Sequence, residues 1–261
     1  MTMPGAPVKR ASSLRWTAAQ CGMAQPSRSP TALRRPTGPP QPRVPNLLMR
    51  VWDAPTRLFH WAIVVLMTFS YVAVQRGWMQ LHFISGYTVL TLLLFRLAWG
   101  FVGSETSRFR QFLRSPVHGL RHLAAFGKRE PDTEIGHNAA GGWMVLAMLA
   151  LLLVQVGSGL FSNDDIDAKG PLAHRVSKAS SDWLSGLHAT SFYILLGLVV
   201  LHIVAIIAYA VVKRHDLVRA MVTGKKRLPA NLRQPRFASP LLAAGILAVA
   251  VGAVWVLVRL A

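Results

Sequence analysis

The chain has 261 residues, of which 52% are hydrophobic and only 15% are charged, and its mean hydropathy is +0.36. Soluble domains seldom combine these values, so the composition predicts an integral membrane protein. The single cysteine, Cys21, excludes disulfides within the chain, cysteine-ligated iron–sulfur clusters and the C-x-x-C-H attachment site of covalently bound haem.

Residues 1–48 are rich in proline, arginine, serine and alanine. This composition cannot supply an apolar core, so we expect a disordered N-terminal extension. Met49 lies just before the patterned sequence. We therefore expect translation started at Met49 to yield the same membrane protein.

Five segments of about 18–25 mostly apolar residues follow, which is the length that a helix needs to cross the hydrocarbon layer. Their apolar character is uninterrupted over many turns and indicates helices rather than barrel strands. The loop between the second and third segments has apolar residues at helical spacing and predicts one or two short surface helices. We place the spans at residues 58–75, 80–102, 142–161, 187–212 and 240–258.

The basic residues alternate between the loops. Of 29 Lys and Arg residues, nine precede the first span, six lie between the second and third, and eight lie between the fourth and fifth. Only Arg76 separates the first two spans, and three basic residues separate the third from the fourth. This positive-inside pattern predicts a multi-pass membrane protein with its N-terminus in the cytoplasm and its C-terminus outside. The placement of the +19 net charge therefore favours a lipid environment over nucleic acid, which we do not expect as a partner.

The fourth span carries His188 and His202, although imidazole is costly to place in lipid. The fourteen residues between these positions turn a helix by about 1400°, close to four full turns, and raise it by about 21 Å. Both histidines therefore share one face, near opposite sides of the hydrocarbon layer. The same face carries Phe192, Leu195 and Val199.

Two other spans carry one histidine each, His60 near the cytoplasmic start of the first and His82 near the outer start of the second. Depth therefore matches His82 with His188, the outer pair, and His60 with His202, the inner pair. The inner match is imperfect, because His202 lies ten residues from the end of its span and His60 only two from the start of its own. Either the fourth span projects into the cytoplasm or the first helix begins nearer Trp52.

Two imidazoles that face each other across a helix bundle can bind both axial positions of a haem iron. A lone buried histidine is more often held by a neighbouring hydroxyl or carbonyl, but four histidines paired by depth favour haem ligation. A metal or proton transporter that uses these histidines is the competing hypothesis. Such a path would need carboxylates or further histidines, and no Asp or Glu lies inside any predicted span.

Several motifs occur in one order along residues 49–227: "VWDAPTRLFHW" (51–61), "LHFISGY" (81–87), "RLAWGFVGS" (96–104), "GHNAAGGWMV" (136–145) and the spaced histidines of the fourth span. In these motifs the chain resembles the bacterial cytochrome b561 family, which includes the b-type cytochrome subunits of nickel–iron hydrogenases. The resemblance implies an all-α integral membrane protein with a four-helix transmembrane bundle and two non-covalent b haems. By that resemblance the axial ligands are His60 and His202 on the inner iron, and His82 and His188 on the outer iron.

Two features depart from the family pattern. Ala139 stands where hydrogenase-type sequences usually have proline after G-H-N, and residues 228–261 add a linker and a fifth span. The fifth span contains no histidine, cysteine or methionine, so it lacks the usual axial ligands. Its small residues suit packing against the bundle itself, a second copy of the chain in a homodimer, or a partner subunit.

Five further residues have two interpretations each. Arg57 and Arg96 lie at cytoplasmic span ends, where they either anchor the helices or pair with propionates of the inner haem. His137 precedes the third span and either contacts a propionate or a quinone, or serves as a helix cap or loop residue. We expect His118 and His122 to lie on a solvated helix face rather than to form a surface metal site.

The resemblance implies a protein of the bacterial inner membrane whose outer side faces the periplasm. It also implies electron transfer between the membrane quinone pool and a partner redox protein, such as a hydrogenase or a c-type cytochrome. No general base, nucleophile or substrate pocket is readable in the sequence. We therefore expect an electron-transfer subunit without catalytic residues rather than a self-sufficient enzyme. Besides the transporter, a membrane anchor with purely structural haems is the alternative.

Overall fold

The computed structural model describes residues 45–113 and 132–261, with residues 115, 117, 119 and 127 between them. Within this part of the chain, five helices are long and apolar enough to cross a membrane. They agree with the five predicted spans. They are α1 (Ala54–Gln75), α2 (Met79–Val102), α5 (Ala139–Gly159), α6 (Lys178–Ala208) and α8 (Pro240–Leu260).

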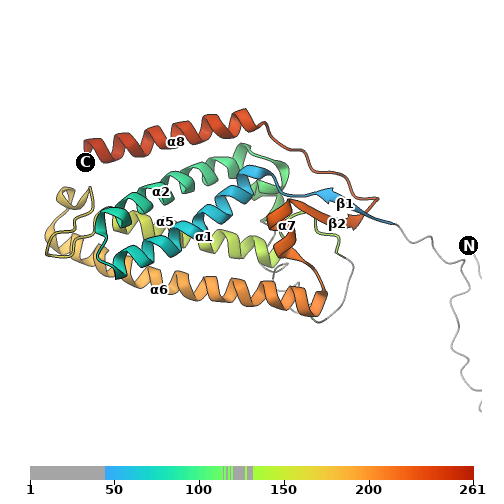
Figure 1. Cartoon of the computed structure of the whole chain (residues 1–261), viewed down its shortest axis with the longest axis horizontal. Coiled ribbons are helices and arrows are strands. Elements are labelled where there is room, and N and C mark those ends of the chain that lie inside the picture. The colour runs from blue at the N-terminus through green and yellow to red at the C-terminus, as the bar shows by residue number, and fades with distance from the viewer. Residues whose placement is uncertain (1–44, 114, 116, 118, 120–126, 128–131) are drawn as a thin grey trace, which may run out of the picture. The chain divides into compact units, whose positions relative to one another are not determined.

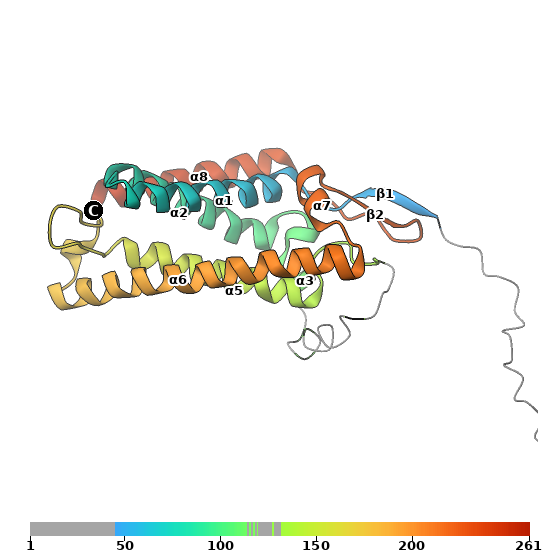
Figure 2. The same cartoon turned by 60° about the horizontal axis from the view of Figure 1, so that its bottom comes forward.

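The first four of these helices form a bundle of two hairpins (Figures 1 and 2). Helix α1 packs on α2, α5 packs on α6, and α2 meets α5. At the centre lies an apolar core of Val89 and Leu93 from α2, Leu149 and Leu152 from α5, and Leu195 from α6. The predicted four-helix membrane bundle with one extra helix is confirmed.

Four of the five spanning helices begin earlier than predicted, and α1 and α6 do so by the widest margins. Helix α1 begins at Ala54, because the Asp53 side chain accepts a hydrogen bond from the Thr56 amide and Pro55 suits the first turn. Helix α6 begins at Lys178, where Ser177 caps it, and its last turn is a π-helix, Tyr209–Lys213. A hydropathy pattern locates the apolar part of a helix, whereas polar caps set its ends. The early start of α1 places His60 deeper in its helix and improves the inner match.

A small sheet, which the sequence did not reveal, closes one end of the bundle. Strand β1 (Asn46–Arg50) pairs antiparallel with β2 (Lys225–Pro229), and α7 (Leu217–Thr223) precedes β2. The predicted boundaries at residues 48 and 227 therefore fall inside strands. These strands are short and pair across most of the chain, so no local alternation marks them. We call this end, where β1, β2 and α7 lie, the β end, and the opposite end, formed by residues 160–177, the loop end.

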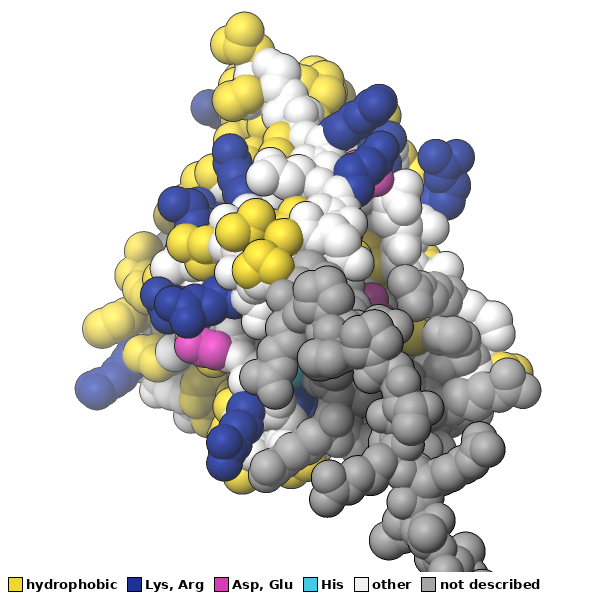
Figure 3. All heavy atoms as spheres, turned by 90° about the vertical axis from the view of Figure 1, so that its right-hand side faces the viewer, with side chains coloured by type: hydrophobic (Ala, Val, Ile, Leu, Met, Phe, Trp, Pro, Cys, Tyr) yellow, Lys and Arg dark blue, Asp and Glu magenta, His cyan; other side chains and the backbone are white. Residues whose placement is uncertain are grey.

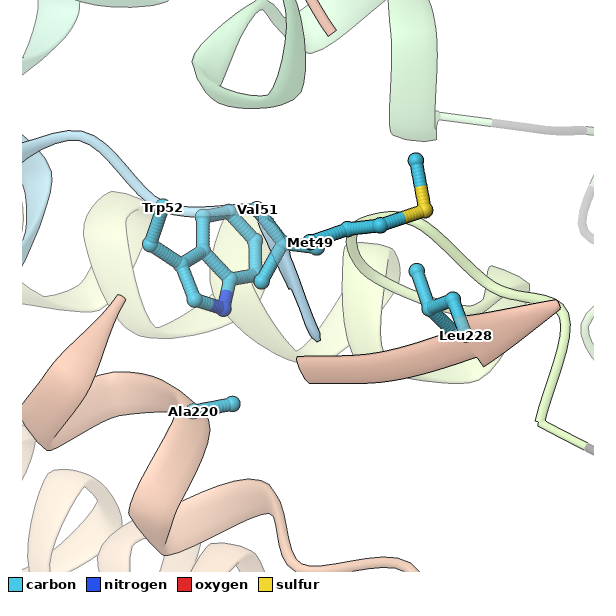
Figure 4. Packing of buried hydrophobic residues seen from close by; sticks show 5 residues of the cluster. All are labelled: Met49, Val51, Trp52, Ala220 and Leu228. Atoms are coloured by element: carbon cyan, nitrogen blue, oxygen red, sulfur yellow. The ribbon is translucent and has the colours of Figure 1, made fainter. Parts of the chain in front are cut away.

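The β end has its own small core (Figure 4). Met49, Val51 and Trp52 pack with Ala220 and Leu228, and all five are nearly or fully buried. Lys and Arg side chains are spread over the described surface of this end (Figure 3). The described basic residues of the three segments in the positive-inside pattern, among them Arg50, Arg108 and Lys225, lie at the β end, which is therefore the predicted cytoplasmic side.

Helix α8 packs on α2 of the same chain. Ala243 and Ala250 meet Phe95 and Trp99, and the small alanine side chains allow the close approach. The linker before α8 is fastened by Glu105, which accepts hydrogen bonds from the Arg233 side chain at 2.7 Å and from the Arg236 amide at 2.9 Å. The bundle, one of the three predicted neighbours, is thus a neighbour of the fifth span.

The loop between α2 and α5 begins with the 3-10 turn η1 (Glu105–Ser107) and the short helix α3 (Phe109–Phe112). Phe112 is buried instead of lying on the surface, since it packs against Gly142 at the start of α5. His118 and His122 lie outside the described residues.

Removing the first strand should weaken the β end. A chain that begins at Arg43 keeps every paired residue and should unfold like the full chain. A chain that begins at Met49 loses Asn46–Leu48 and uncovers the fully buried Leu228, so its free energy of unfolding should fall by about 1–2 kcal/mol. Thermal unfolding of both truncations in detergent measures the difference, and equal midpoints would contradict it.

Candidate functional site

Helix α6 presents one face to the bundle and the other away from it. Ser191 and Leu195, at 1% and 3% exposure, lie between His188 and His202 on the inward face, whereas Tyr193 and Ile194 on the opposite face are exposed. The predicted histidine face is therefore the face that packs. Both of its histidines are partly buried.

The outer pair, His82 and His188, comes together near the loop end. His82 lies in the first turn of α2 and His188 lies in α6, so two separate helices supply the two rings. The ring centroids are 6.1 Å apart and the ring planes are at 87° to each other. Two imidazoles at this separation leave room for one metal ion between their nitrogens, since an iron–nitrogen bond is about 2 Å long.

The hydrogen bonds of the outer pair determine which ring nitrogen carries the proton. His188 Nδ1 lies 2.7 Å from the main-chain carbonyl of Gln155, which can only accept, so Nδ1 must donate. His82 Nδ1 lies 2.9 Å from Ser70 Oγ and 3.3 Å from the Ser70 carbonyl, and it donates by the same argument. Neutral His82 and His188 therefore each keep the lone pair on Nε2. This is the arrangement of metal-ligating histidines, whose second ring nitrogen donates to a carbonyl or hydroxyl.

A glycine gives the His188 ring its space. A Cβ atom at Gly159 would lie 2.8 Å from His188 Cε1 and 2.9 Å from Nδ1, closer than carbon atoms pack. Gly159 is in the last turn of α5, four residues after Gln155, whose carbonyl holds the same ring. Glycine at this position thus allows α5 to approach the imidazole edge-on.

Replacing Gly159 by alanine should displace the His188 ring and break its hydrogen bond to the Gln155 carbonyl. If the outer pair binds a haem, the variant should lose most of that haem and keep the inner one. Gly157→Ala is the matched control, because a Cβ atom at Gly157 meets nothing within 4 Å. Haem content and the redox difference spectrum of both variants measure the effect, and equal spectra would contradict it.

The inner pair, His60 and His202, lies toward the β end. His60 is in the second turn of α1 and His202 is in α6, and the two side chains are close enough to interact electrostatically. His60 Nδ1 is buried and finds no hydrogen-bond partner in the described part of the protein. A buried polar atom without a partner costs free energy, which suits a site that is completed by another molecule.

Both candidate arginines lie at the β end, in different surroundings. Arg96 is 3% exposed, and its guanidinium lies over the Phe109 ring at 5.1 Å. Its Nη1 atom has no partner among the described residues. Arg57 donates from Nη1 to the carbonyl of Val222 in α7, while its buried Nε is also without a described partner. Arg96 is thus no surface anchor, and both side chains have donors available for an anion.

His137 lies beside the inner pair and the buried arginine. Its ring is packed against Trp52 and Phe112, with centroid distances of 4.7 and 5.1 Å. Burial, together with the nearby positive charge of Arg96, lowers the pKa of His137 to about 3, so the ring is neutral at physiological pH. The helix cap of α5 is Asn138, which accepts from the Gly141 amide, and not His137.

A pocket of about 250 Å³ opens at the β end and reaches His137. Its walls include Thr106 of η1 and Phe112 of α3, and Glu134 and Arg233 lie around it. The Thr106 hydroxyl is buried and has no partner in the described part of the chain. The pocket thus combines an apolar wall with an imidazole and a hydroxyl that can bind a polar group.

Asp53, a residue without a predicted role, organises the β end. Its carboxylate is 2% exposed and accepts hydrogen bonds from the Thr56 amide at 2.8 Å, Trp99 Nε1 at 3.0 Å and Ser107 Oγ at 3.2 Å. Burial opposes ionisation, but hydrogen bonds from Ser104, Thr56 and Trp99 outweigh it, so the pKa of Asp53 lies below its ordinary value. Asp53 thereby joins the start of α1, the end of α2 and η1.

Three other residues around the pairs were missed. Ser70 and Gln155 hold the outer histidines, and Asn138 binds the Tyr209 hydroxyl at 2.8 Å. Asp53 before Ala-Pro and the lone Gln155 in an apolar span were readable signals of a cap and of a buried polar contact. Ser70 carries no such signal, because serine in a membrane helix commonly bonds its own backbone.

The described residues hold no group of three or more His, Cys, Asp or Glu side chains that could bind a metal ion. The histidines lie instead at two depths, with His82 facing His188 at the outer level and His60 close to His202 at the inner level. A pair of neutral imidazoles is the ligand set of a six-coordinate haem, whose porphyrin supplies the other four nitrogens. The geometry therefore fits haem at the outer pair, and the unpartnered donors fit an anionic group near the inner pair.

Comparison with known proteins agrees with this chemistry. The chain is 24% identical over 214 residues to the "Probable Ni/Fe-hydrogenase B-type cytochrome subunit" of Bradyrhizobium diazoefficiens, an alignment that covers 68% of this chain and 85% of that protein. Residues 51–224 match the family described as prokaryotic cytochrome b561, and this match includes both histidine pairs. With two thirds of its length matched, the chain belongs to the prokaryotic cytochrome b561 family.

Proposed function

We propose that this b-type cytochrome carries electrons across the membrane through two haems, one at the outer pair and one at the inner pair. Membership of the family supports a b-type haem and electron transfer. Haem at the pairs is supported above all by the geometry of the outer pair. Its two rings lie 6.1 Å apart, and each ring donates from Nδ1 and keeps Nε2 free to ligate. A bound b haem supplies a one-electron redox centre.

The chain's own residues orient and insulate each site. His82 and His188 would supply the axial nitrogens of the outer site, and His60 and His202 those of the inner site. Leu93, Leu152 and Leu195 fill the space between the two levels and exclude water from it. The rise of about 21 Å between His188 and His202 supports two sites near opposite sides of the hydrocarbon layer.

The inner site would hold the negative groups of its haem through Arg96 and Arg57. Arg96 Nη1 and Arg57 Nε lack partners in the described part of the protein, and arginine is well suited to bind carboxylates. The burial of Arg96 favours this role, because a buried Nη1 donor without an acceptor is costly. Neutral His137 lies next to these groups and can donate or accept a hydrogen bond.

The pocket at His137 supports exchange with a quinone at the predicted cytoplasmic side. Its aromatic wall from Phe112 suits a ring, and the Thr106 hydroxyl and the His137 imidazole suit carbonyl oxygens. At the loop end, the partner would be a redox protein. The relative from Bradyrhizobium diazoefficiens is described as a hydrogenase cytochrome subunit, which favours a hydrogenase, and a c-type cytochrome is the alternative.

Orientation in the bacterial inner membrane follows from the charges. With the basic β end in the cytoplasm, α1 begins inside and α8 ends outside, where Arg175 of the loop end donates to the Leu260 carbonyl at 3.1 Å. A C-terminal reporter that is active only outside the cytoplasm should therefore be active on the full chain.

The test is the haem content and redox titration of the purified full-length protein. We expect two haems per chain, low-spin spectra typical of two histidine ligands, and two redox transitions. A content well below one haem per chain, in cells with ample haem supply, would contradict the proposal and favour a transporter. Haems that are present but cannot be oxidised by a quinone or reduced by a partner would leave only the anchor role.

A further inference from the structure

The outer pair is the more completely supported of the two histidine pairs. Both of its Nδ1 atoms have hydrogen-bond acceptors, whereas His60 Nδ1 of the inner pair has none within the described part of the chain. The support comes from two side chains that are not ligands, Ser70 in α1 and Gln155 in α5. Each sits on the helix that packs against the helix carrying its histidine.

Ser70 supplies the shorter contact to His82. Its Oγ lies 2.9 Å from Nδ1, and its carbonyl lies 3.3 Å from the same atom. Since Nδ1 donates, the hydroxyl acts as acceptor for the imidazole. A hydrogen bond that draws the proton away from Nδ1 makes Nε2 of the same ring a stronger electron-pair donor to a metal ion.

Gln155 supports His188 from two sides. Its main-chain carbonyl accepts from Nδ1, and its side-chain nitrogen lies 3.3 Å from Nδ1 and 3.2 Å from Nε2. A group on the axis of the Nε2 lone pair would be much farther from Nδ1 than from Nε2. The amide therefore lies beside the ring and leaves that axis open.

The Gln155 amide is itself held in place. Its Oε1 accepts from Ser191 Oγ at 2.5 Å, and Gln155 and Ser191 are 7% and 1% exposed. Ser191 is on α6, in the turn after His188. With Oε1 bound there, the amide nitrogen must point to the imidazole, so the ring cannot rotate without breaking a buried contact.

We propose that Ser70 and Gln155 are positioning residues of the outer haem site: Ser70 lowers the midpoint potential of the outer haem through His82, and Gln155 with Ser191 fixes the rotation of the His188 ring. The inference rests on the proposed function, because it requires haem at the outer pair. A ligand that donates more strongly stabilises the oxidised iron and so lowers its potential. If the 87° between the ring planes is kept when haem binds, the ferric outer site should give the strongly anisotropic low-spin signal of perpendicular ligands.

Redox titration and electron paramagnetic resonance of full-length variants test the proposal. Ser70→Ala should shift the outer transition to higher potential and leave the inner one unchanged, and Ser70→Thr should restore it. Gln155→Leu should change the ferric signal of the outer site. The controls are Thr68→Ala and Thr88→Ala, whose exposed hydroxyls donate to carbonyls of their own helices, those of Val64 and Ile84.

The outcomes separate the two levels of inference. Wild-type protein without haem overturns the proposed function. Two haems with unshifted outer potential in Ser70→Ala, or an unchanged ferric signal in Gln155→Leu, overturn the positioning role alone. Selective loss of the outer haem from Ser70→Ala, rescued by Ser70→Thr, supports that role, and loss of both haems contradicts it.

Discussion

Replacing His188 by alanine should leave a cytochrome that binds one haem instead of two. The substitution removes one axial nitrogen from the outer pair, and the surrounding Gln155 and Ser191 side chains cannot take its place on the open axis. The inner pair is about 21 Å away along α6 and shares no ligand with the outer pair. We therefore expect the inner transition to persist, while electron transfer from an external donor across the membrane is lost.

The complementary variants make this prediction a test of the pairing. His82→Ala should remove the same transition as His188→Ala, and His60→Ala should remove the same one as His202→Ala. His174→Ala is the matched control, since His174 is an exposed histidine of the loop end. The measurement is haem content together with redox titration of each purified variant. The pairing by depth would be wrong if His60→Ala and His82→Ala erased the same transition.

Replacing Asp53 by alanine should destabilise the protein more than any exposed substitution. The change leaves Trp99 Nε1, the Thr56 amide and Ser107 Oγ without their buried acceptor. It also removes the negative charge that interacts with the buried Arg96. Unsatisfied buried donors and an uncompensated charge together cost about 3 kcal/mol or more. Because Asp53 joins α1, α2 and η1, we also expect weaker haem retention at the inner pair.

Thermal unfolding in detergent measures this loss, with Asp167→Ala as the control. Asp167 is exposed at the loop end, so its removal should change the free energy of unfolding by less than about 0.5 kcal/mol. The pKa of Asp53 is lowered by folding, so its stabilisation is present above its unfolded pKa of about 3.9 and is lost as pH falls through the folded value. The stability difference between wild type and variant should therefore shrink only at strongly acidic pH. An equal midpoint for Asp53→Ala and Asp167→Ala would contradict the role of the buried carboxylate.

Hydropathy and helical periodicity were sufficient to predict the five spans and the histidine face of α6. Both are local properties, since an apolar run of spanning length must be helical in lipid, and a fourteen-residue spacing returns to the same face. The depth matching of His82 with His188 also followed from topology, and the structure brings these two rings together. Haem ligation by these histidines remains a prediction, which the histidine-to-alanine variants test.

Only the tertiary structure decided which groups surround those histidines. Strands β1 and β2 pair over most of the chain length, and their pairing left no local pattern to read. The small residues of α8 suit several neighbours equally well in the sequence. Its place on α2 follows from the fit of its alanines against Phe95 and Trp99, which only the tertiary structure shows. Ser70, Gln155 and Asp53 acquire their roles from atoms supplied by other helices. A sequence pattern determines how each helix lies in lipid, whereas the hydrogen bonds that orient a ligand depend on which side chains packing brings within about 3 Å.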